Sequence, residues 1–340
     1  MALWTDIITP VEATGALRVE MEEREAQKGT LARWMPNVAV DDTVVKFYVG
    51  NHGLVEPAHW RAFNAAPEII ASEDVTSRVV ELAAVSNNQP IDERTQLAIT
   101  RMPADQARKS VEAAIRRAAW SIADAVEAVR GSVFATGVAT TNQHNFNLND
   151  NFGRAPELTV TAPALWSDDA TDGLGQLDDW VQVYEQYNLG QGPGALVMSR
   201  QAFRAFTRLA QFRQVMLGGA SRPSGAQDVR NAVEAQGLPP IIVFDRSTQY
   251  GPVLPQDRIF LAPAPVDPSS PDGGELGATF WGQTVTAQSP EFGLLPGEQP
   301  GAVVGVYRED KVPYKLEVMA DAITLPVARD ANKVMSVKVL

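Results

Sequence analysis

The clearest pattern of apolar and polar positions along this chain lies between Met102 and Val133. Alanine, valine and isoleucine recur there at spacings of three and four residues, which is the period of one face of an α-helix. The positions are Ala107, Val111, Ala114, Ile115, Ala118, Ile122, Ala125, Val126 and Val129. Pro103 suits the start of such a helix, and Asp105 favours the positive end of its dipole. The pattern predicts a helix of about 30 residues and about 45 Å, whose small side chains let its neighbours pack closely.

Two segments with different patterns precede this helix. Residues 1–34 contain a charged, helix-forming stretch, Leu17–Lys28, whose apolar residues form no broad stripe, so it needs another surface to lie on. Residues 35–100 contain β-branched runs, at Val44–Gly50 and Arg78–Val85, and long polar connections that include the turn signal SNNQP. A compact domain rarely spends so many residues in this way, so we expect a long projecting hairpin.

The second half of the chain alternates short apolar runs with short amphipathic segments, as a mixed α/β domain does. A helix is expected over Leu177–Leu189, and another after the buried run Ala195–Met198, with Ser199 as its N-cap. Further strands are expected at Ile241–Asp245, Arg258–Ala262, Ala278–Gly282 and Ala302–Tyr307. The chain ends with strand character at Lys338–Leu340, which predicts that its two termini help to complete one central layer.

The composition excludes several classes of function. The 340 residues, 45% of them hydrophobic, are enough for about two domains with a real core. There is no cysteine, which excludes disulfides, thiolate metal sites and cysteine nucleophiles, and three histidines argue against a zinc site. A net charge of −12 argues against a dedicated DNA-binding protein. Without a secretory signal or a long apolar run, no membrane span is expected, and the protein should form in a cytoplasm.

Motifs of common enzyme classes are absent from the sequence. It contains no G-x-x-x-x-G-K-S/T, no G-x-S-x-G and no H-E-x-x-H. The acidic cluster Asp168, Asp169 and Asp172 precedes a predicted helix, where carboxylates usually mark a helix start; an α/β hydrolase that uses one of them is the remote alternative. The segment around His144 offers mostly amides, so a polar turn or interface loop is favoured over a calcium site. We therefore predict no catalytic residue, metal ligand or cofactor.

Arginines are concentrated without acids between Ser199 and Gln227. They are Arg200, Arg204, Arg208, Arg213 and Arg222. The first three share one helix face at positions i, i+4 and i+8. Such a face can meet carboxylates of a neighbouring subunit or lie near phosphate, while a solvated face is the simpler alternative. Trp60, one of several scattered tryptophans, is predicted to be a core or interface anchor.

Several local sequences, in their order and spacing, resemble the lambda-type major capsid protein E family of tailed bacteriophages, especially its versions from phages of actinobacteria. The segments that carry the likeness are Glu81–Glu93, Glu127–Val138, Asn151–Asp172, Gly194–Phe206 and Tyr314–Leu340. The likeness covers nearly the whole chain. It implies an α+β fold of the Hong Kong 97-like phage capsid type, with a peripheral (P) domain formed by a long spine helix and a β-sheet, an axial (A) domain, an N-terminal arm and an E-loop.

The resemblance also assigns each part of the chain and a function. It places the N-terminal arm at 1–44, the E-loop region at 45–96, the P domain at 97–176 with its spine helix at 102–133, the A domain at 177–305, and closing strands of the P domain at 306–340. It implies a structural protein of the virion, not an enzyme, that assembles as hexamers and pentamers into an icosahedral head around double-stranded DNA. The implied partners are other copies, a decoration or cement protein, a portal, a scaffolding protein and weakly held DNA, with assembly in the cytoplasm of a bacterial host.

Two further expectations concern subunit contacts and the nearest alternative function. Some capsids of this fold are cross-linked through Lys–Asn isopeptide bonds; here only Lys46 and a polar turn at Asn87–Asn88 form a pair to test, and no cross-link is expected. The candidate inter-subunit contacts are Arg200, Arg204, Arg208, Trp60 and Lys46. An encapsulin-like compartment shell, which shares the fold and holds cargo enzymes, is the nearest alternative. No fused scaffolding domain is expected, because no long coiled-coil prefix precedes the arm.

Overall fold

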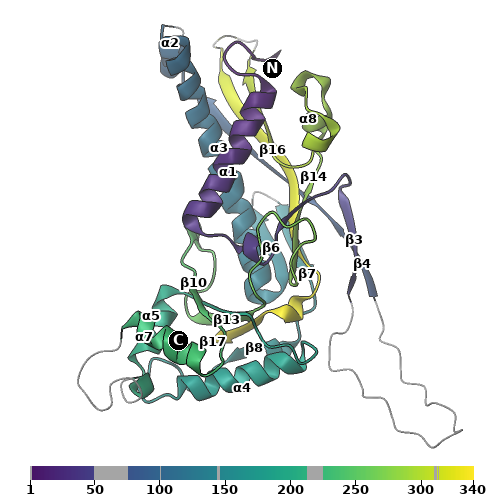
Figure 1. Ribbon diagram of the computed structural model, residues 1–340. Helices are drawn as coiled ribbons and strands as arrows, with labels where there is room; N and C mark the ends of the chain where they lie inside the picture. Colours follow the sequence, from purple (N-terminus) through teal and green to yellow (C-terminus); the bar gives the residue numbers. More distant parts are fainter. Residues whose placement is uncertain are drawn as a thin grey trace, which may run out of the picture.

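The computed structural model describes residues 2–49, 76–99, 101–143, 146–212, 225–309, 312 and 314–340. Figure 1 shows an elongated upper body with two long helices, above a lower domain of shorter helices and strands. A six-stranded sheet forms the upper body, and a five-stranded sheet forms the lower domain. The C-terminus lies in the lower domain and the N-terminus at the far end of the upper body.

The longest element is helix α3, Ala104–Thr136, which has 33 residues. It confirms the helix predicted from the apolar period, although it begins two residues later and ends three residues later. Its buried face consists of small and β-branched residues, among them Val111, Ala114 and Ile115, each fully buried. The helix ends at Gly137, whose φ of +73° is the left-handed conformation that glycine adopts readily.

Helices α1 and α3 pack on the upper sheet, with α1 over β15 and α3 over β16 and β5. Helix α1 spans Pro10–Lys28 and begins with a capping box, in which Thr9 and Glu12 satisfy each other's backbone amides. The sheet has the order β1-β15-β16-β14-β2, and β5 also pairs with β16. Its strands are β1 Ala2–Leu3, β2 Asn37–Ala39, β5 Ala83–Ile91, β14 Gly277–Gly282, β15 Val303–Arg308 and β16 Leu316–Ala328.

Three helices form a layer with the lower sheet, whose order is β10-β9-β13-β17-β8. The strands are β8 Thr159–Thr161, β9 Ala195–Met198, β10 Ile241–Val243, β13 Arg258–Ala262 and β17 Met335–Lys338. The helices are α4 Gly173–Gln186, α5 Arg200–Arg208 and α7 Ala226–Ala235. Their apolar faces share one core with the sheet, in which the rings of Trp166 and Phe206 lie 4.6 Å apart. Helix α5 has the predicted N-cap, because the Ser199 hydroxyl accepts a hydrogen bond from the Ala202 amide at 3.0 Å.

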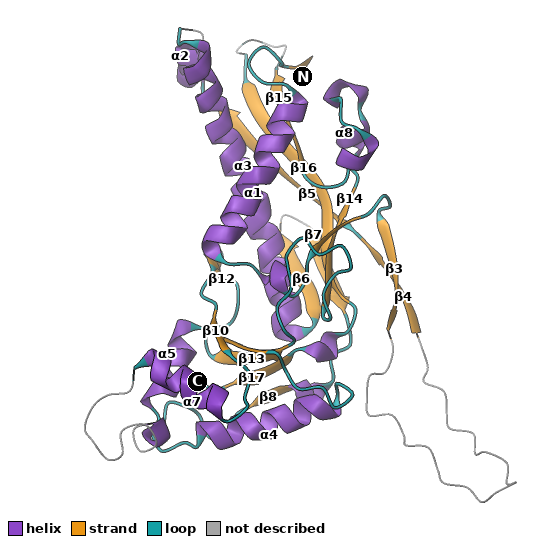
Figure 2. Cartoon of the chain, in the orientation of Figure 1, coloured by secondary structure: helices purple, strands orange, loops and turns teal. Residues whose placement is uncertain are grey.

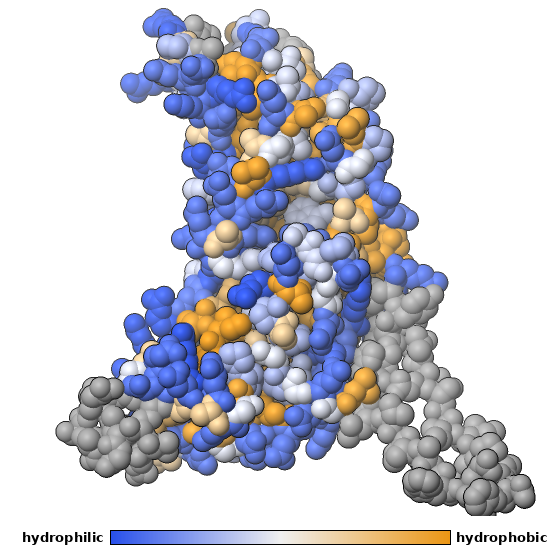
Figure 3. All heavy atoms as spheres, viewed as in Figure 1, coloured by the Kyte–Doolittle hydropathy of each residue, from blue (hydrophilic) through white to orange (hydrophobic). Residues whose placement is uncertain are grey.

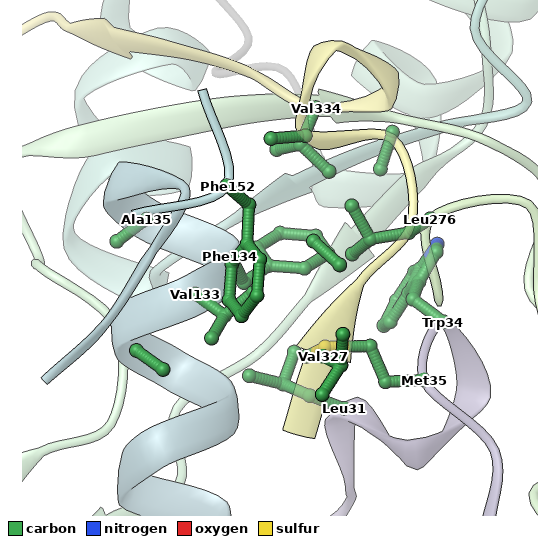
Figure 4. Packing of buried hydrophobic residues seen from close by; sticks show 14 of the residues in the cluster. Leu31, Trp34, Met35, Val133, Phe134, Ala135, Phe152, Leu276, Val327 and Val334 are labelled. Carbon is green, nitrogen blue, oxygen red and sulfur yellow. The ribbon is translucent and has the colours of Figure 1, made fainter. Parts of the chain in front are cut away.

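The end of α3 joins the two sheets through a second core. Phe134 lies in its centre (Figure 4), with its ring centroid 5.3 Å from that of Trp34 and 5.5 Å from that of Phe260 in β13. Val327 of β16 belongs to the same cluster, so side chains of both sheets pack around the C-terminal turn of α3. This core fixes the lower domain relative to the upper body.

The remaining elements are short and lie outside the two main sheets. Three are hairpins: β3 Val44–Val49 with β4 Thr76–Glu81, β6 Val138–Gln143 with β7 Phe146–Asn151, and β11 Ser247–Thr248 with β12 Gly251–Pro252. Two are short helices, α2 Glu93–Ile99 and α8 Val285–Gln288. The 3₁₀ turns are η1 Leu31–Arg33, η2 Pro156–Leu158, η3 Pro290–Phe292, η4 Pro296–Glu298 and η5 Ala331–Lys333. In Figure 2 the β3–β4 hairpin stands away from the upper sheet, on the right of the view.

The prediction that both termini complete one layer is wrong. Strand β1 pairs with β15 in the upper sheet, whereas β17 pairs with β13 and β8 in the lower sheet. Between them, after β16, the chain turns through η5, where the Asp330 carboxylate accepts a hydrogen bond from the Asn332 amide at 3.0 Å. Apolar alternation indicates that a segment is a strand, but the sheet that it joins depends on distant partners.

Two of the ranges named in the sequence analysis contribute strands to the upper sheet. Strand β5, inside the range 45–96, pairs with β16 along nine positions of the upper sheet. Asn87 and Asn88 therefore lie within a strand, and the predicted turn at this position is wrong. Strand β14 and part of β15 lie inside the range 177–305, yet they belong to the upper sheet.

Candidate interaction surfaces

The three predicted arginines of α5 lie together on one exposed face. Ala202, Phe203 and Phe206 bury the opposite face against the lower sheet. We call Arg200, Arg204 and Arg208 the basic ridge. The side chains are exposed in this structure, as the i, i+4, i+8 spacing predicts.

The basic ridge lines a hollow of about 580 Å³ together with Asp245, Gln256 and Leu340. Asp245 lies 3.0 Å from the Arg200 Nε, and its other oxygen accepts a hydrogen bond from the Arg200 backbone amide at 2.9 Å. Arg204 makes no ion pair with any residue that the structure describes. The chain therefore neutralises the ridge only in part.

Helix α4 forms a surface of the opposite charge. The 45 residues between Arg154 and Arg200 contain seven carboxylates and no lysine, arginine or histidine. We call the exposed pair Asp178 and Asp179 on α4 the acidic face. In the space-filling view of Figure 3, hydrophilic residues cover most of the bottom edge of the molecule, where α4 runs in Figure 1.

The acidic cluster before α4 organises the start of that helix. The Asp172 carboxylate accepts a hydrogen bond from the Gly175 amide at 3.0 Å and is the N-cap of α4. Asp168 accepts a hydrogen bond from the Ala170 amide at 3.0 Å. Both side chains and that of Asp169 are exposed. Asp172 thus has the helix-start role that the sequence favoured, Asp168 stabilises the turn before the helix, and the cluster has no buried carboxylate of the kind a hydrolase would need.

Of the remaining predicted contacts, the structure describes Lys46. Lys46 is exposed on β3. Both asparagines considered for a cross-link already donate hydrogen bonds, Asn87 to the Ser121 hydroxyl at 2.6 Å and Asn88 to the Glu317 carboxylate at 2.7 Å. Trp60 and His144 lie outside the described residues.

A buried ionic cluster, which the sequence did not predict, joins α1, α3 and the loop after β10. At its centre the Arg130 side chain is fully buried, and all three of its nitrogens donate hydrogen bonds. Nη1 lies 2.6 Å from Glu25 and 3.0 Å from the fully buried Glu127. Burial alone lowers the pKa of the Arg130 guanidinium, but these two carboxylates more than offset it, and the net pKa is raised.

The same cluster continues through Asp124, which binds two arginines. Its oxygens lie 2.8 Å from Arg24 of α1 and 2.8 Å from the nearly buried Arg246. Arg246 also donates to the Gly29 carbonyl at 2.8 Å, directly after α1. Partial burial raises the pKa of Asp124, but hydrogen bonds and charge from both arginines lower it further, so it lies below its usual value.

Helix α1 is thus held on its own chain by charges as well as by apolar contact. Outside the buried cluster, Glu20 lies 2.7 Å from Arg116 of α3. Arg18 donates hydrogen bonds to the carbonyls of Glu298, Pro300 and Ala302. The amino-terminal segment, expected to need a surface to lie on, finds that surface on α3 and β15 of the same chain.

Arg154 stabilises the C-terminal end of α3 from within the protein. Its guanidinium donates to the carbonyls of Phe134 and Ala135, each at 2.9 Å, and to that of Ala331 at 3.1 Å. Cations are favoured at this end of a helix, where carbonyls lack intrahelical partners. Burial lowers the pKa of Arg154 to about 9, so the side chain remains mostly charged at neutral pH.

Two common types of functional site have no counterpart in the described part of the chain. No group of three or more histidines and carboxylates is arranged there to hold a metal ion. None of the described helices is both long and apolar enough to span a membrane. Among the described residues, the basic ridge and the acidic face are two surfaces of opposite charge on the lower domain, and such surfaces suit contact with a macromolecule.

The fold is that of solved phage proteins. A structure described as the capsid protein of a prophage of Escherichia coli CFT073 aligns with a TM-score of 0.63 at 14% identity, over 96% of this chain and 99% of that chain. A phage-related protein from Bordetella bronchiseptica RB50 aligns with a TM-score of 0.58 at 13% identity, over 99% of this chain and 97% of that chain. The expected α+β Hong Kong 97-like fold is confirmed.

Sequence comparison alone gives no such match. No protein-family model matches the chain, and no curated protein is similar to it in sequence. The likeness therefore lies in the arrangement of helices and strands. The residues that contact other molecules can be inferred only from the surfaces of this chain.

Proposed function

We propose that this chain is the major capsid protein of a tailed bacteriophage, a structural subunit that assembles as hexamers and pentamers into an icosahedral head around double-stranded DNA. The observation that carries the proposal is the end-to-end match with a prophage capsid protein, which covers 96% of this chain and 99% of that one.

The shape of the chain suits a subunit that makes several different contacts. A stiff helix of 33 residues supports the upper body, and the β3–β4 hairpin stands away from it. A closed shell of identical chains needs heterologous contacts, in which two different surfaces of each copy meet. Many contacts of ordinary size together stabilise a large particle.

The proposed function also suggests a role for each part of the chain, and we propose these roles with it. Residues 1–44 with α1 form the arm, the β3–β4 hairpin begins and ends the E-loop, the upper body is the P domain, and the lower domain is the A domain. The proposed partners are other copies, a decoration protein, a portal and a scaffolding protein, with assembly in a bacterial cytoplasm. A net charge of −12 keeps packaged DNA from adhering to the inner wall.

Negative-stain electron microscopy, combined with the mass from size-exclusion chromatography, tests the proposal. Closed shells of tens of nanometres, or free hexamers and pentamers, are the expected result. A monomer of 36.8 kDa at every concentration, salt and pH would contradict it. Shells from the native host that hold protein cargo and no DNA would instead identify an encapsulin-like compartment.

A further inference from the structure

The basic ridge and the acidic face belong to the same domain but lie on different sides of it. Helices α4 and α5 share the core of the lower domain, and the first residue of α4, Gly173, packs against Phe206 and Leu209 at the end of α5. Figure 1 shows α5 at the left end of the lower domain and α4 along its base. Their spacing and orientation are therefore fixed before any partner binds.

Each surface contains a charged side chain that forms no ion pair with the residues that the structure describes. Arg204 has no ion pair there, and Arg200, whose side chain is 65% exposed, has only Asp245. On α4, Asp178 accepts a hydrogen bond from the neutral Gln182, and Asp179 has no ion pair with a described residue. Each surface can still form charge-assisted hydrogen bonds with a group of opposite charge.

We propose that the basic ridge of one copy binds the acidic face of α4 on the next copy, in a head-to-tail contact of the lower domains. The inference rests on the proposed function and adds the surfaces through which neighbouring subunits of one ring recognise each other. Because the two surfaces differ, each copy uses one toward each neighbour, and the contact repeats around a ring. A two-fold contact of the ridge with itself would bring like charges together, which disfavours it.

The net charge of the whole chain opposes the association of copies. Copies that each carry −12 repel one another at long range. The basic ridge is a concentrated positive surface on this acidic protein, and it attracts carboxylates of another copy at short range. The hollow in front of the ridge, about 580 Å³, gives those side chains room to enter.

Arginines also bind phosphate, so DNA is the competing occupant of the ridge. One observation favours a second copy. The acidic face lies on the helix packed next to α5, so a continuous polyanion that followed the surface would meet carboxylates.

A charge-swap experiment with the full chain tests the contact. One variant reverses the ridge, Arg204→Glu with Arg208→Glu, and a second reverses the acidic face, Asp178→Arg with Asp179→Arg. A third combines all four changes, and Lys109→Glu, at an exposed position on α3, is the matched control. For each we would measure the protein concentration at which hexamers, pentamers or shells form, by light scattering and electron microscopy, and the DNA bound to purified protein.

The expected result is a loss of assembly in each reversed variant and its return in the combined variant. Each reversal should raise the concentration needed for assembly by about tenfold or more, because like charges then face each other, and Lys109→Glu should leave it unchanged. Restored assembly in the combined variant cannot come from a misfolded protein. High salt should weaken wild-type assembly, since the Debye length falls to about 3 Å at 1 M.

Other outcomes would overturn the inference in distinguishable ways. If the wild type assembles and both reversed variants assemble equally well, the contact is absent while the proposed function stands. If the ridge reversal spares assembly but reduces DNA binding, phosphate is the occupant instead. If the combined variant fails while both reversed variants fold, the two surfaces do not meet. A wild type that never leaves the monomer would overturn both proposals.

Discussion

The molecule uses arginine in two contrasting ways. In the buried ionic cluster, Arg130 has no exposed side-chain surface, and two carboxylates and several neutral groups accept its hydrogen bonds. In the basic ridge, Arg204 is exposed and has no ion pair with a described residue. A charge inside a protein must be matched by its own chain, because desolvation without a partner costs too much. A charge on the surface can be left for another molecule, so the first group should determine folding and the second assembly.

Replacing the central arginine should have the largest effect on stability. Arg130→Met leaves Glu127 fully buried without its nearest cation, and loss of one partner of a buried pair costs about 3–5 kcal/mol. We expect the free energy of unfolding, measured by urea denaturation, to fall by about this amount. Arg204→Met is the control of similar size and should change it by less than about 0.5 kcal/mol. An equal loss of unfolding free energy in the two variants would show that the burial of an arginine does not determine how much it stabilises the fold.

Helix α3 packs closely against the loop after β12, next to the same cluster, and a substitution at Gly131 tests this contact. A Cβ atom at Gly131 would lie 2.3 Å from the Val253 carbonyl oxygen, so the backbone would have to move. We expect Gly131→Ala to lower the free energy of unfolding, measured by urea denaturation, by about 1–3 kcal/mol, the usual cost of overpacking.

Gly15→Ala is the matched control for this substitution. Gly15 lies in α1 with nothing within 4 Å of the added atom, and alanine should stabilise that helix by about 0.5–1 kcal/mol. The free energy of unfolding should therefore fall in Gly131→Ala and rise in Gly15→Ala. A stabilised Gly131→Ala variant would mean that α3 and the loop are not held in this close contact.

The contrast between the two arginine groups also shows how far sequence reasoning reaches. Helices α3 and α5 were predictable, because apolar period, N-cap and arginine spacing are all written within a single element. In the buried cluster, Glu127 and Arg130 interrupt the mostly apolar second half of α3, which was a usable signal. Their partner Glu25 lies 105 positions from Arg130, and nothing local pairs them.

Partners in sheets are equally remote in sequence. Strand β17 carries the predicted alternation, but it pairs within the five-stranded sheet and not within the six-stranded one. Asn87 and Asn88 resemble a turn, because polar residues are common in turns, but their amides donate hydrogen bonds to Ser121 of α3 and Glu317 of β16. The exposed basic ridge, in contrast, was visible in advance because solvent-facing charge needs no partner within the fold.

Acid should weaken the buried cluster through Asp124. Its pKa lies below the usual value in the folded protein, because Arg24 and Arg246 outweigh the effect of burial. A lowered folded pKa means that its contribution is fully present above the unfolded pKa, near 4, and is lost as the pH falls through the folded pKa.

Asp124→Asn tests this dependence. The variant should be less stable than the wild type at pH 7 by about 1–2 kcal/mol, as expected for hydrogen bonds to charged groups. The difference should narrow below pH 4, where the wild-type carboxyl also becomes neutral. Denaturation at several pH values measures it, and a difference that stays constant down to pH 2 would show that Asp124 contributes through shape rather than charge.

The exposed pair between α1 and α3 should have the smallest effect, although its geometry is good. Glu20 and Arg116 lie 2.7 Å apart, but the Arg116 side chain is 48% exposed. Ion pairs in water gain little, because solvent screens the attraction and ordering two long side chains costs entropy. A double-mutant cycle with Glu20→Gln and Arg116→Met should give a coupling below about 1 kcal/mol, and about 1 M salt should remove it. A coupling as large as the loss in Arg130→Met would show that close contact, and not burial, decides which ion pairs hold α1 in place.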